Sequence, residues 1–292
     1  MRHERDRANK RERMRQMRAQ EEARLAALPP QQRAAYEEEA RRLRVEAALA
    51  QKAAAAAALA GGGQRVVVDC SYVTQVEELH APRHGARARE PAAQGSARSL
   101  AKQVEIAMGL NRRSERPLAL TLTSFRGALA AFCDHNGAAA WPIARHEGHV
   151  ADVFASERSN LVMLSPDAPD ALDGPLDSAA VYVIGGIVDK SVVKGLSLGW
   201  AAAAGVRAAR LPVREYADDL GMAFGGANKT PVLSISDVVV ALLEAGRTGG
   251  DWAAALGAAL PERVRRAGVA GAGRRRQPRR RDAAAGRGGG CS

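Results

Sequence analysis

Between residues 65 and 262 the chain alternates short apolar runs with longer segments in which apolar residues recur at helical spacing. Runs rich in Val, Ile, Leu and Ala predict buried strands at 66–70, 118–123, 161–164, 181–184 and 207–211. Helical spacing predicts helices at 99–113, 126–134, 196–204, 234–245 and 251–260. Because strands alternate with helices, we expect an α/β fold with a mostly parallel sheet and helices on both faces.

The first 60 residues follow a different pattern, dominated by Arg, Glu, Gln and Ala. Glu37 and Arg41 illustrate the i,i+4 spacing of opposite charges that supports an exposed helix. We predict two exposed helices, at 3–27 and 31–58, with a break at Pro29. Their apolar stripes are too thin for a long coiled coil.

Several stretches have the composition of boundaries or loops. An alanine run and the glycines at 61–63 mark the start of the globular part. The stretches 80–97 and 214–230 read as loops, and 135–159 reads as irregular. We therefore expect a basic helical N-terminal arm at 1–60, a globular domain at 61–262 and a disordered Arg/Gly-rich tail at 263–292.

Positive charge is concentrated at the two ends of the chain. The formal net charge is +11, of which 1–60 carry +5 and 263–292 carry +9, whereas 61–262 carry −3. Basic arms on a nearly neutral body suggest a polyanionic partner that is bound in a salt-dependent way. A solubilising or targeting tail would have the same composition, so charge alone leaves both interpretations open.

Other residue types limit the class of protein. The three cysteines are odd in number and have no CxxC spacing, so we expect reduced thiols in an intracellular protein rather than disulfides or zinc. No apolar run is long enough to predict a membrane span, and the N-terminal residues lack the apolar stretch typical of a secretory signal, so we expect neither. His146 and His149 lie three apart, but no further ligand is spaced to complete a site, so we expect no metal.

The most informative stretch is 181–196. Its apolar run ends at Gly185 and Gly186, which indicate a sharp turn or the close approach of another group to the backbone. Asp189 would lie beyond the carboxyl end of a parallel strand, where open α/β sheets bind ligands. The alternative is a buried strand followed by a tight loop with a solvated Asp.

The strand-following glycines form neither G-x-G-x-x-G nor a P-loop, so a dinucleotide or nucleoside triphosphate is not indicated. The H-E-x-x-H, G-x-S-x-G and kinase motifs are also absent from the sequence.

An ordered series of motifs adds a family to this picture. The series runs S-L-A-K-Q-V, N-R-R, L-T-L-T-S, L-S-P-D-A-P, Y-V-I-G-G-I-V-D, K-G-L, A-R-L-P and V-L-S-I-S-D-V-V. It resembles the tRNA guanine-9 N1-methyltransferases of the SPOUT superfamily over 66–261, and the basic N-terminal arm also fits that family. The resemblance implies a parallel sheet with a C-terminal trefoil knot, although knots are rare among folds.

In that family S-adenosylmethionine lies bent within the knot and is held largely by backbone groups. The resemblance places the methyl donor against Leu164, Ser165, Gly185, Gly186, Lys190, Ser191, Val192, Val193, Lys194, Leu198, Leu211, Val232, Leu233 and Ser234. These positions are strand ends and glycine turns, where a backbone can approach a ligand closely.

The resemblance matches Asp189 to the aspartate proposed as the general base of the family. N1 of guanine carries a proton that must leave before N1 attacks the methyl group, and a carboxylate can accept that proton or orient a water. The implied activity is S-adenosylmethionine-dependent methylation of N1 of guanine at position 9 of tRNA. The alternatives are methylation of adenine at position 9 and a non-catalytic tRNA-binding subunit.

The resemblance implies tRNA as the partner and a monomeric protein, with no membrane partner. Expected tRNA contacts are Lys102, Gln103, Asn111, Arg112, Arg113 and Arg126. A solvated surface charge is the alternative for each basic residue. The Arg-rich run at 274–281 and the absence of other signals predict the nucleus or the cytoplasm.

Overall fold

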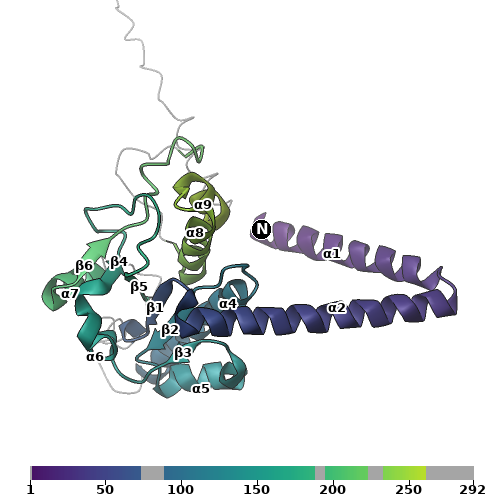
Figure 1. Ribbon diagram of the computed structural model, residues 1–292, viewed down its shortest axis with the longest axis horizontal. Coiled ribbons are helices and arrows are strands. Elements are labelled where there is room, and N and C mark those ends of the chain that lie inside the picture. The colour runs from purple at the N-terminus through teal and green to yellow at the C-terminus, as the bar shows by residue number, and fades with distance from the viewer. Residues whose placement is uncertain (1, 74–88, 188–194, 223–232, 261–292) are drawn as a thin grey trace, which may run out of the picture. The chain divides into compact units, whose positions relative to one another are not determined.

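The computed structural model describes residues 2–73, 89–187, 195–222 and 233–260 (Figure 1). The chain divides into two compact units, Met1–Ala54 and Ala55–Ser292, and the larger unit contains the sheet. Within the described ranges, no helix has both the length and the hydropathy needed to cross a membrane.

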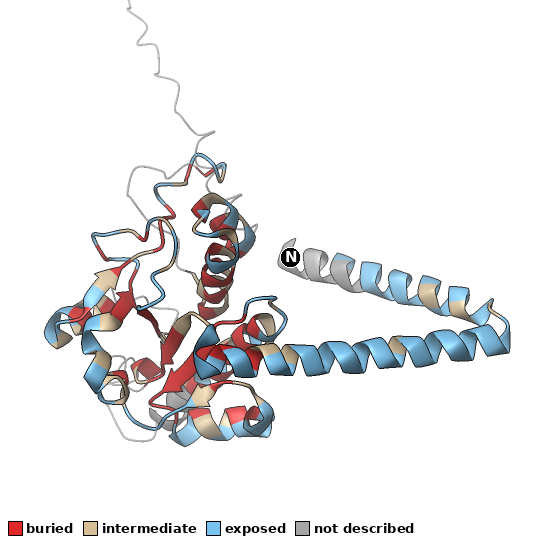
Figure 2. Ribbon diagram, in the orientation of Figure 1, coloured by how far each residue is buried: buried red, intermediate tan, exposed pale blue. Residues whose placement is uncertain are grey.

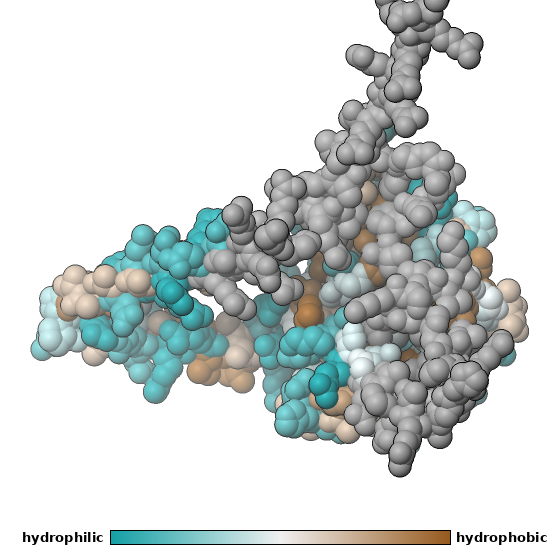
Figure 3. Space-filling view, turned by 180° about the vertical axis from the view of Figure 1, so that it is seen from behind, coloured by the Kyte–Doolittle hydropathy of each residue, from teal (hydrophilic) through white to brown (hydrophobic). Residues whose placement is uncertain are grey.

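The N-terminal unit consists of α1 (Arg2–Ala26) and most of α2 (Pro30–Ala57). Exposed charge pairs run along both helices, such as Arg33 Nε at 2.8 Å from Glu37 Oε1. The Tyr36 hydroxyl donates to Glu21 Oε1 at 3.0 Å and connects the two helices. Hydrophilic side chains dominate this unit in Figure 3. The two exposed helices predicted from charge spacing are confirmed.

The larger unit is built on one six-stranded sheet in the order β3-β2-β1-β5-β4-β6, and every strand pair is parallel. The strands are β1 (Arg65–Asp69), β2 (Ala119–Thr123), β3 (Ala144–Arg145), β4 (Leu161–Leu164), β5 (Val181–Gly185) and β6 (Arg207–Ala209). The register places Asp69 beside both Thr123 and Gly185, so the carboxyl ends of β2, β1 and β5 meet at one edge. The predicted parallel sheet is confirmed.

Helices cover both faces of this sheet, as predicted. The helices are α4 (Arg89–Arg112), α5 (Gly127–His135), α6 (Val150–Val153), α7 (Leu196–Ala204), α8 (Ile235–Thr248) and α9 (Trp252–Ala259). Val66 and Val68 of β1 pack into one hydrophobic cluster with α4, α5, α8 and α9. Val67 points to the opposite face and packs with α6 and α7. The central strands are therefore buried on both sides (Figure 2).

Three predicted boundaries are wrong. The helix α4 begins at Arg89, so the end of the predicted loop 80–97 is helical. Pro91 lies in the first turn of that helix, where a backbone N–H has no intrahelical partner, so proline does not stop the helix. The strand β6 ends at Ala209 rather than 211. The helix α8 continues to Thr248, where Gly249 in the left-handed conformation (φ 67°) ends it.

The stretch 135–159 is more ordered than the irregular segment that we predicted. It contains 3-10 turns at Ala138–Ala140 and Ala155–Asn160 in addition to β3 and α6. Such short elements leave no hydrophobic period in the sequence, because a two-residue strand has no alternation to detect.

The expected trefoil knot depends on the path of the chain through 188–194 and 223–232, and the expected disordered tail starts beyond 260. These segments lie outside the described residues, so both expectations stay predictions.

Candidate active site

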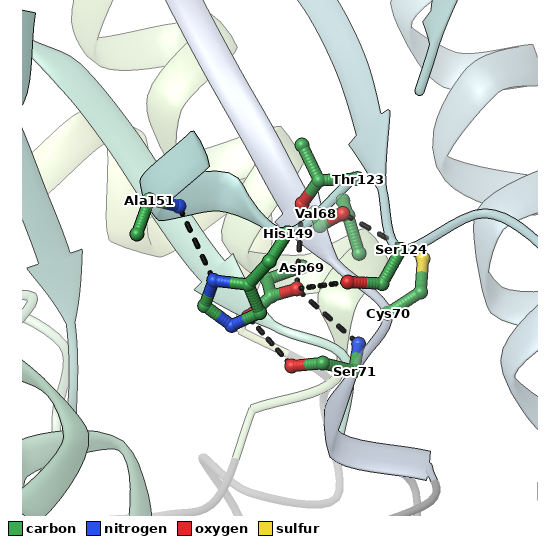
Figure 4. A network of polar contacts seen from close by, with 8 residues as sticks. All are labelled: Val68, Asp69, Cys70, Ser71, Thr123, Ser124, His149 and Ala151. Carbon is green, nitrogen blue, oxygen red and sulfur yellow. Dashed lines mark hydrogen bonds and ion pairs between the residues drawn. The ribbon is translucent and has the colours of Figure 1, made fainter. Parts of the chain in front are cut away.

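A buried carboxylate lies at the carboxyl end of β1, and sequence analysis did not single it out. Asp69 is fully buried, and its two oxygens accept four hydrogen bonds (Figure 4). Ser71 donates its backbone N–H to Oδ1 at 3.2 Å and its hydroxyl to Oδ2 at 2.8 Å. The hydroxyls of Thr123 and Ser124, at the end of β2, donate to Oδ1 at 3.3 Å each. These donors satisfy a charge whose burial would otherwise be costly.

His149 approaches the same carboxylate from the loop before α6. Its Nε2 lies 3.5 Å from Asp69 Oδ2, and its Nδ1 accepts the backbone N–H of Ala151 at 3.2 Å (Figure 4). The ring also packs against Trp200 of α7, with ring centroids 5.6 Å apart. The spacing of His146 and His149 predicted no metal site, and the structure pairs His149 with Asp69. Among the described residues, no group of three or more His, Cys, Asp or Glu could hold a metal ion.

Ser124 has a strained backbone at this position. With φ at 53°, it is the one residue other than glycine with a positive φ in the described ranges. Its N–H donates to Gly148 O at 2.8 Å, which ties the end of β2 to the loop that carries His149. Non-glycine residues in this region of φ cost free energy and concentrate at functional sites.

The glycine turn after β5 packs directly on Asp69. Gly186 donates its N–H to Asp69 O at 2.9 Å, and a Cβ on Gly186 would lie 2.8 Å from that oxygen. A Cβ on Gly185 would lie 3.3 Å from the ring of Tyr72. Of the two interpretations of these glycines, the close approach of another group is correct, and the group is the protein's own backbone and Tyr72.

The loop after β4 holds the start of α7. Ser165 is buried, and the Ser197 hydroxyl donates to Ser165 Oγ at 2.9 Å. Asp167 Oδ2 accepts the N–H of Gly195, the N-cap of α7, at 2.8 Å. The structure therefore brings the end of β4 and the beginning of α7 together, and Leu164, Ser165 and Leu198 of the predicted donor-binding set lie on these two segments.

Two sets of hydrogen bonds hold the N-terminus of α8. Ser234 forms a capping box, in which its hydroxyl accepts the N–H of Asp237 and Asp237 accepts the N–H of Ser234. Gln103 of α4 contributes its Oε1, which accepts the N–H of Ile235 at 3.0 Å. The carbonyl oxygen of Gln103, a predicted tRNA contact, is thus engaged within the protein, whereas the helix start predicted from Ser234 is confirmed.

The predicted donor-binding residues fall into two groups. Those within the described residues are Leu164, Ser165, Gly185, Gly186, Leu198, Leu211, Leu233 and Ser234. Leu164 and Gly185 end their strands, Ser165 and Gly186 directly follow them, and Leu211 lies two residues beyond β6. Leu198 lies in the first turn of α7, and Leu233 and Ser234 immediately precede α8. Asp189, Lys190, Ser191, Val192, Val193, Lys194 and Val232 lie outside the described residues.

The predicted tRNA contacts differ in accessibility. Arg112, Arg113 and Arg126 are exposed, and Lys102 Nζ lies 2.9 Å from Glu105 Oε2 on the surface. Asn111 is instead buried: its Nδ2 donates to Leu118 O and its Oδ1 accepts the Leu118 N–H. Asn111 therefore joins the end of α4 to the residue that precedes β2, and its side chain is buried.

Cysteine chemistry is disfavoured at this site. Cys70 follows Asp69, and it and Cys133 are free and buried in the described part of the chain. Burial raises the pKa of Cys70 well above its ordinary value and that of Cys133 to about 12. Both thiols therefore remain protonated at neutral pH, and a protonated thiol is a poor nucleophile.

Tyr72 gives a testable stability prediction. Its side chain is fully buried, and its hydroxyl has no hydrogen-bond partner among the described residues. We expect Tyr72→Phe to raise the free energy of unfolding by about 1 kcal/mol, because it removes an unpaired buried polar group. Tyr182→Phe is the matched control and should lower stability by about 1 kcal/mol, since the Tyr182 hydroxyl accepts the Asp177 N–H at 3.0 Å. Urea titration compares the two, and an equal loss in both variants would show that the Tyr72 hydroxyl is satisfied in solution.

Comparison with known proteins identifies the family. The sequence model described as tRNA (guanine(9)-N(1))-methyltransferase TRM10/TRM10A matches residues 92–265. The chain is 30% identical over 207 residues to tRNA methyltransferase 10 homolog A of Rattus norvegicus, covering 68% of this chain and 52% of that protein. It is 34% identical over 159 residues to tRNA (guanine(9)-N(1))-methyltransferase Trmt10A of Drosophila melanogaster, covering 53% of this chain and 46% of that protein. The chain thus spans about half the length of the curated relatives that it matches.

A solved structure agrees with the sequence comparison. The structure of full-length spTrm10 in complex with SAH superposes with a TM-score of 0.53 at 25% identity, over 68% of this chain and 94% of that one. Both the fold and the sequence therefore confirm the resemblance found in the ordered motifs. The chain belongs to the TRM10/TRM10A family of tRNA (guanine(9)-N(1))-methyltransferases.

Proposed function

We propose that this chain transfers the methyl group of S-adenosylmethionine to N1 of guanine at position 9 of tRNA. The observation that carries the proposal is the family match over 92–265, which includes every predicted donor-binding residue and the predicted general base. The SAH complex of spTrm10 supports S-adenosylmethionine as the donor, since SAH is what remains after the methyl leaves.

The described residues fit such a donor. The ends of β4, β5 and β6 lie side by side, because Leu164 pairs with both Ile184 and Ala209. The carboxyl edge of a parallel sheet is where open α/β folds bind ligands. When bound, S-adenosylmethionine supplies a methyl group on a sulfonium, which is already a good leaving group and needs no metal. The task of the chain is then to hold N1 of guanine in line with that methyl group.

Asp189 is proposed to accept the N1 proton or to orient a water that accepts it. A carboxylate beyond the carboxyl end of β5 suits this role, because the target base and the methyl group must meet at that edge. We expect Asp189→Asn to lower kcat about tenfold and to leave the affinity for the donor unchanged. Single-turnover kinetics and calorimetric titration with SAH separate these two effects. An equal loss of donor affinity would show that Asp189 supports the donor site instead.

The basic arm at 1–60 is proposed to add affinity for the tRNA backbone. Its helices are exposed and rich in Arg, as a phosphate-binding surface requires. Arg112, Arg113 and Arg126 are proposed as further phosphate contacts. We also propose that the protein acts as a monomer in the nucleus or the cytoplasm, which light scattering and imaging of the tagged full chain would test.

The decisive assay uses purified protein, labelled S-adenosylmethionine and transcripts that carry either guanine or adenine at position 9. We expect label only in the guanine transcript. Label in the adenine transcript alone would establish the other base as substrate. Binding of both transcripts without any transfer would establish a non-catalytic tRNA-binding subunit.

A further inference from the structure

His149 connects three elements around the glycine turn. Its two ring nitrogens face different partners, Asp69 of β1 and the backbone N–H of Ala151 in α6. Its ring packs against Trp200 of α7, at a tilt of 51°. The side chain is 29% exposed, while the Asp69 side chain that it faces is fully buried. His149 is therefore a partly exposed side chain beside a buried carboxylate.

The contacts define which nitrogen carries the proton. Because Nδ1 accepts the Ala151 N–H, Nδ1 has no hydrogen of its own. In the neutral ring the proton is then on Nε2, which lies 3.5 Å from Asp69 Oδ2. The N–H thus points toward a carboxylate, and neither nitrogen is available to take a proton from a substrate.

Asp69 transmits this contact to the glycine turn. Its backbone oxygen accepts the N–H of Gly186 at 2.9 Å, and a Cβ on Gly186 would collide with that oxygen. This hydrogen bond ties the turn to the end of β1. A displacement of Asp69 would therefore be passed on to Gly186, which lies three residues before the proposed general base in the sequence.

We propose that His149 is a positioning residue for methyl transfer, acting through Asp69 on the Gly185–Gly186 turn. The inference rests on the proposed function, because it assigns His149 a part in the same reaction. Its weight comes from the convergence of three elements on one side chain and from the strained Ser124, which donates to the same carboxylate. A side chain that only fills space at this position would not need polar contacts through both ring nitrogens, as His149 has.

The competing explanation is that His149 serves only as the N-cap of α6. Its Nδ1 does satisfy the first turn of that helix. The two explanations depend on different ring nitrogens, and two substitutions separate them. His149→Asn places an oxygen near the position of Nδ1 and keeps the cap but loses the group that faces Asp69. His149→Gln places an N–H near the position of Nε2 and keeps the contact with Asp69 but loses the cap.

The experiment measures kcat and KM for the guanine-9 transcript and for S-adenosylmethionine, with the full-length protein and both variants. We expect His149→Asn to lower kcat about tenfold with both KM values nearly unchanged, a smaller loss than a full 1 Å misplacement can cause. We expect His149→Gln to keep kcat within about threefold of the wild type. In thermal unfolding we expect the opposite order: His149→Gln should unfold at a lower temperature than His149→Asn, because it loses the cap, which contributes to stability.

The chemical shifts of the His149 ring nitrogens and the kcat values of the two variants decide the outcome. The imidazole nitrogen shifts of His149 should report a proton on Nε2, and a proton on Nδ1 would overturn the proposal without any activity assay. Full kcat in His149→Asn, or loss of kcat in His149→Gln alone, would also overturn it. A wild-type protein that binds the transcript without methylating it would refute the proposed function itself, which is a different result.

Discussion

Replacing Gly186 with alanine is expected to lower methyl transfer about a hundredfold and to destabilise the globular unit by about 1–3 kcal/mol. The added Cβ would lie 2.8 Å from Asp69 O and 3.2 Å from Leu100 Cδ2. The first of these atoms belongs to the backbone of the central strand β1 and has little freedom to move. The turn must therefore shift instead, and Gly185 and Gly186, which form it, are themselves proposed to contact the donor.

Gly246→Ala is the matched control for this change. Gly246 lies in α8, and a Cβ there would meet only Leu176 Cδ1 at 3.8 Å, an ordinary contact. We expect this variant to keep full activity and to gain up to about 1 kcal/mol of stability, because alanine favours a helix over glycine. Steady-state methylation and urea titration measure both variants. A Gly186→Ala protein as active as Gly246→Ala would mean that the turn does not position the reacting groups.

Asp69→Ala is expected to lower the free energy of unfolding by about 3 kcal/mol, because it leaves several donors without an acceptor in a buried site. The donors that lose their acceptor are the backbone N–H and hydroxyl of Ser71 and the hydroxyls of Thr123 and Ser124. Activity should fall as well, since the same side chain faces His149 and the same residue anchors Gly186.

Tryptophan fluorescence during urea titration is a suitable measurement, because Trp141, Trp200 and Trp252 all belong to the larger unit. Asp219→Ala, at an exposed position, should change stability by less than about 0.5 kcal/mol. The free energy of unfolding of Asp69→Asn should lie between those of Asp69→Ala and Asp219→Ala, because the amide oxygen of Asn can still accept hydrogen bonds at the Oδ1 position. If Asp69→Ala were as stable as Asp219→Ala, the hydrogen bonds of this network would contribute nothing to the folded state.

Sequence reasoning recovered the elements that have a strong local pattern. Apolar runs located β1, β4 and β5, because both faces of these strands are buried. The leucines of β2 located that strand although Thr121 and Thr123 interrupt its apolar run. Ser234 with Asp237 three residues later marked the start of α8, and the capping box shows why. The paired glycines after β5 indicated a sharp turn or a close approach, and the structure supplies the partner of the close approach, the backbone of Asp69.

The rest depended on contacts between residues far apart in the chain. Asp69 follows a buried valine run, and that position was the available signal, but its importance comes from Thr123, Ser124 and His149, which arrive from other elements. The sequence spacing of His149 suggested only an incomplete metal site. Asn111 appeared as a surface residue within the N-R-R motif, whereas the return of the chain into β2 buries it.

The measurement that tests the central claim most directly is nucleoside mass spectrometry of a guanine-9 transcript after incubation with the purified full-length protein and S-adenosylmethionine. Digestion and fragment mapping locate the added methyl group. The account predicts one methyl group per tRNA, on N1 of guanine 9, and none when position 9 carries another base. A methyl group at a different position or atom, or no methyl group on a transcript that the protein binds, would contradict it.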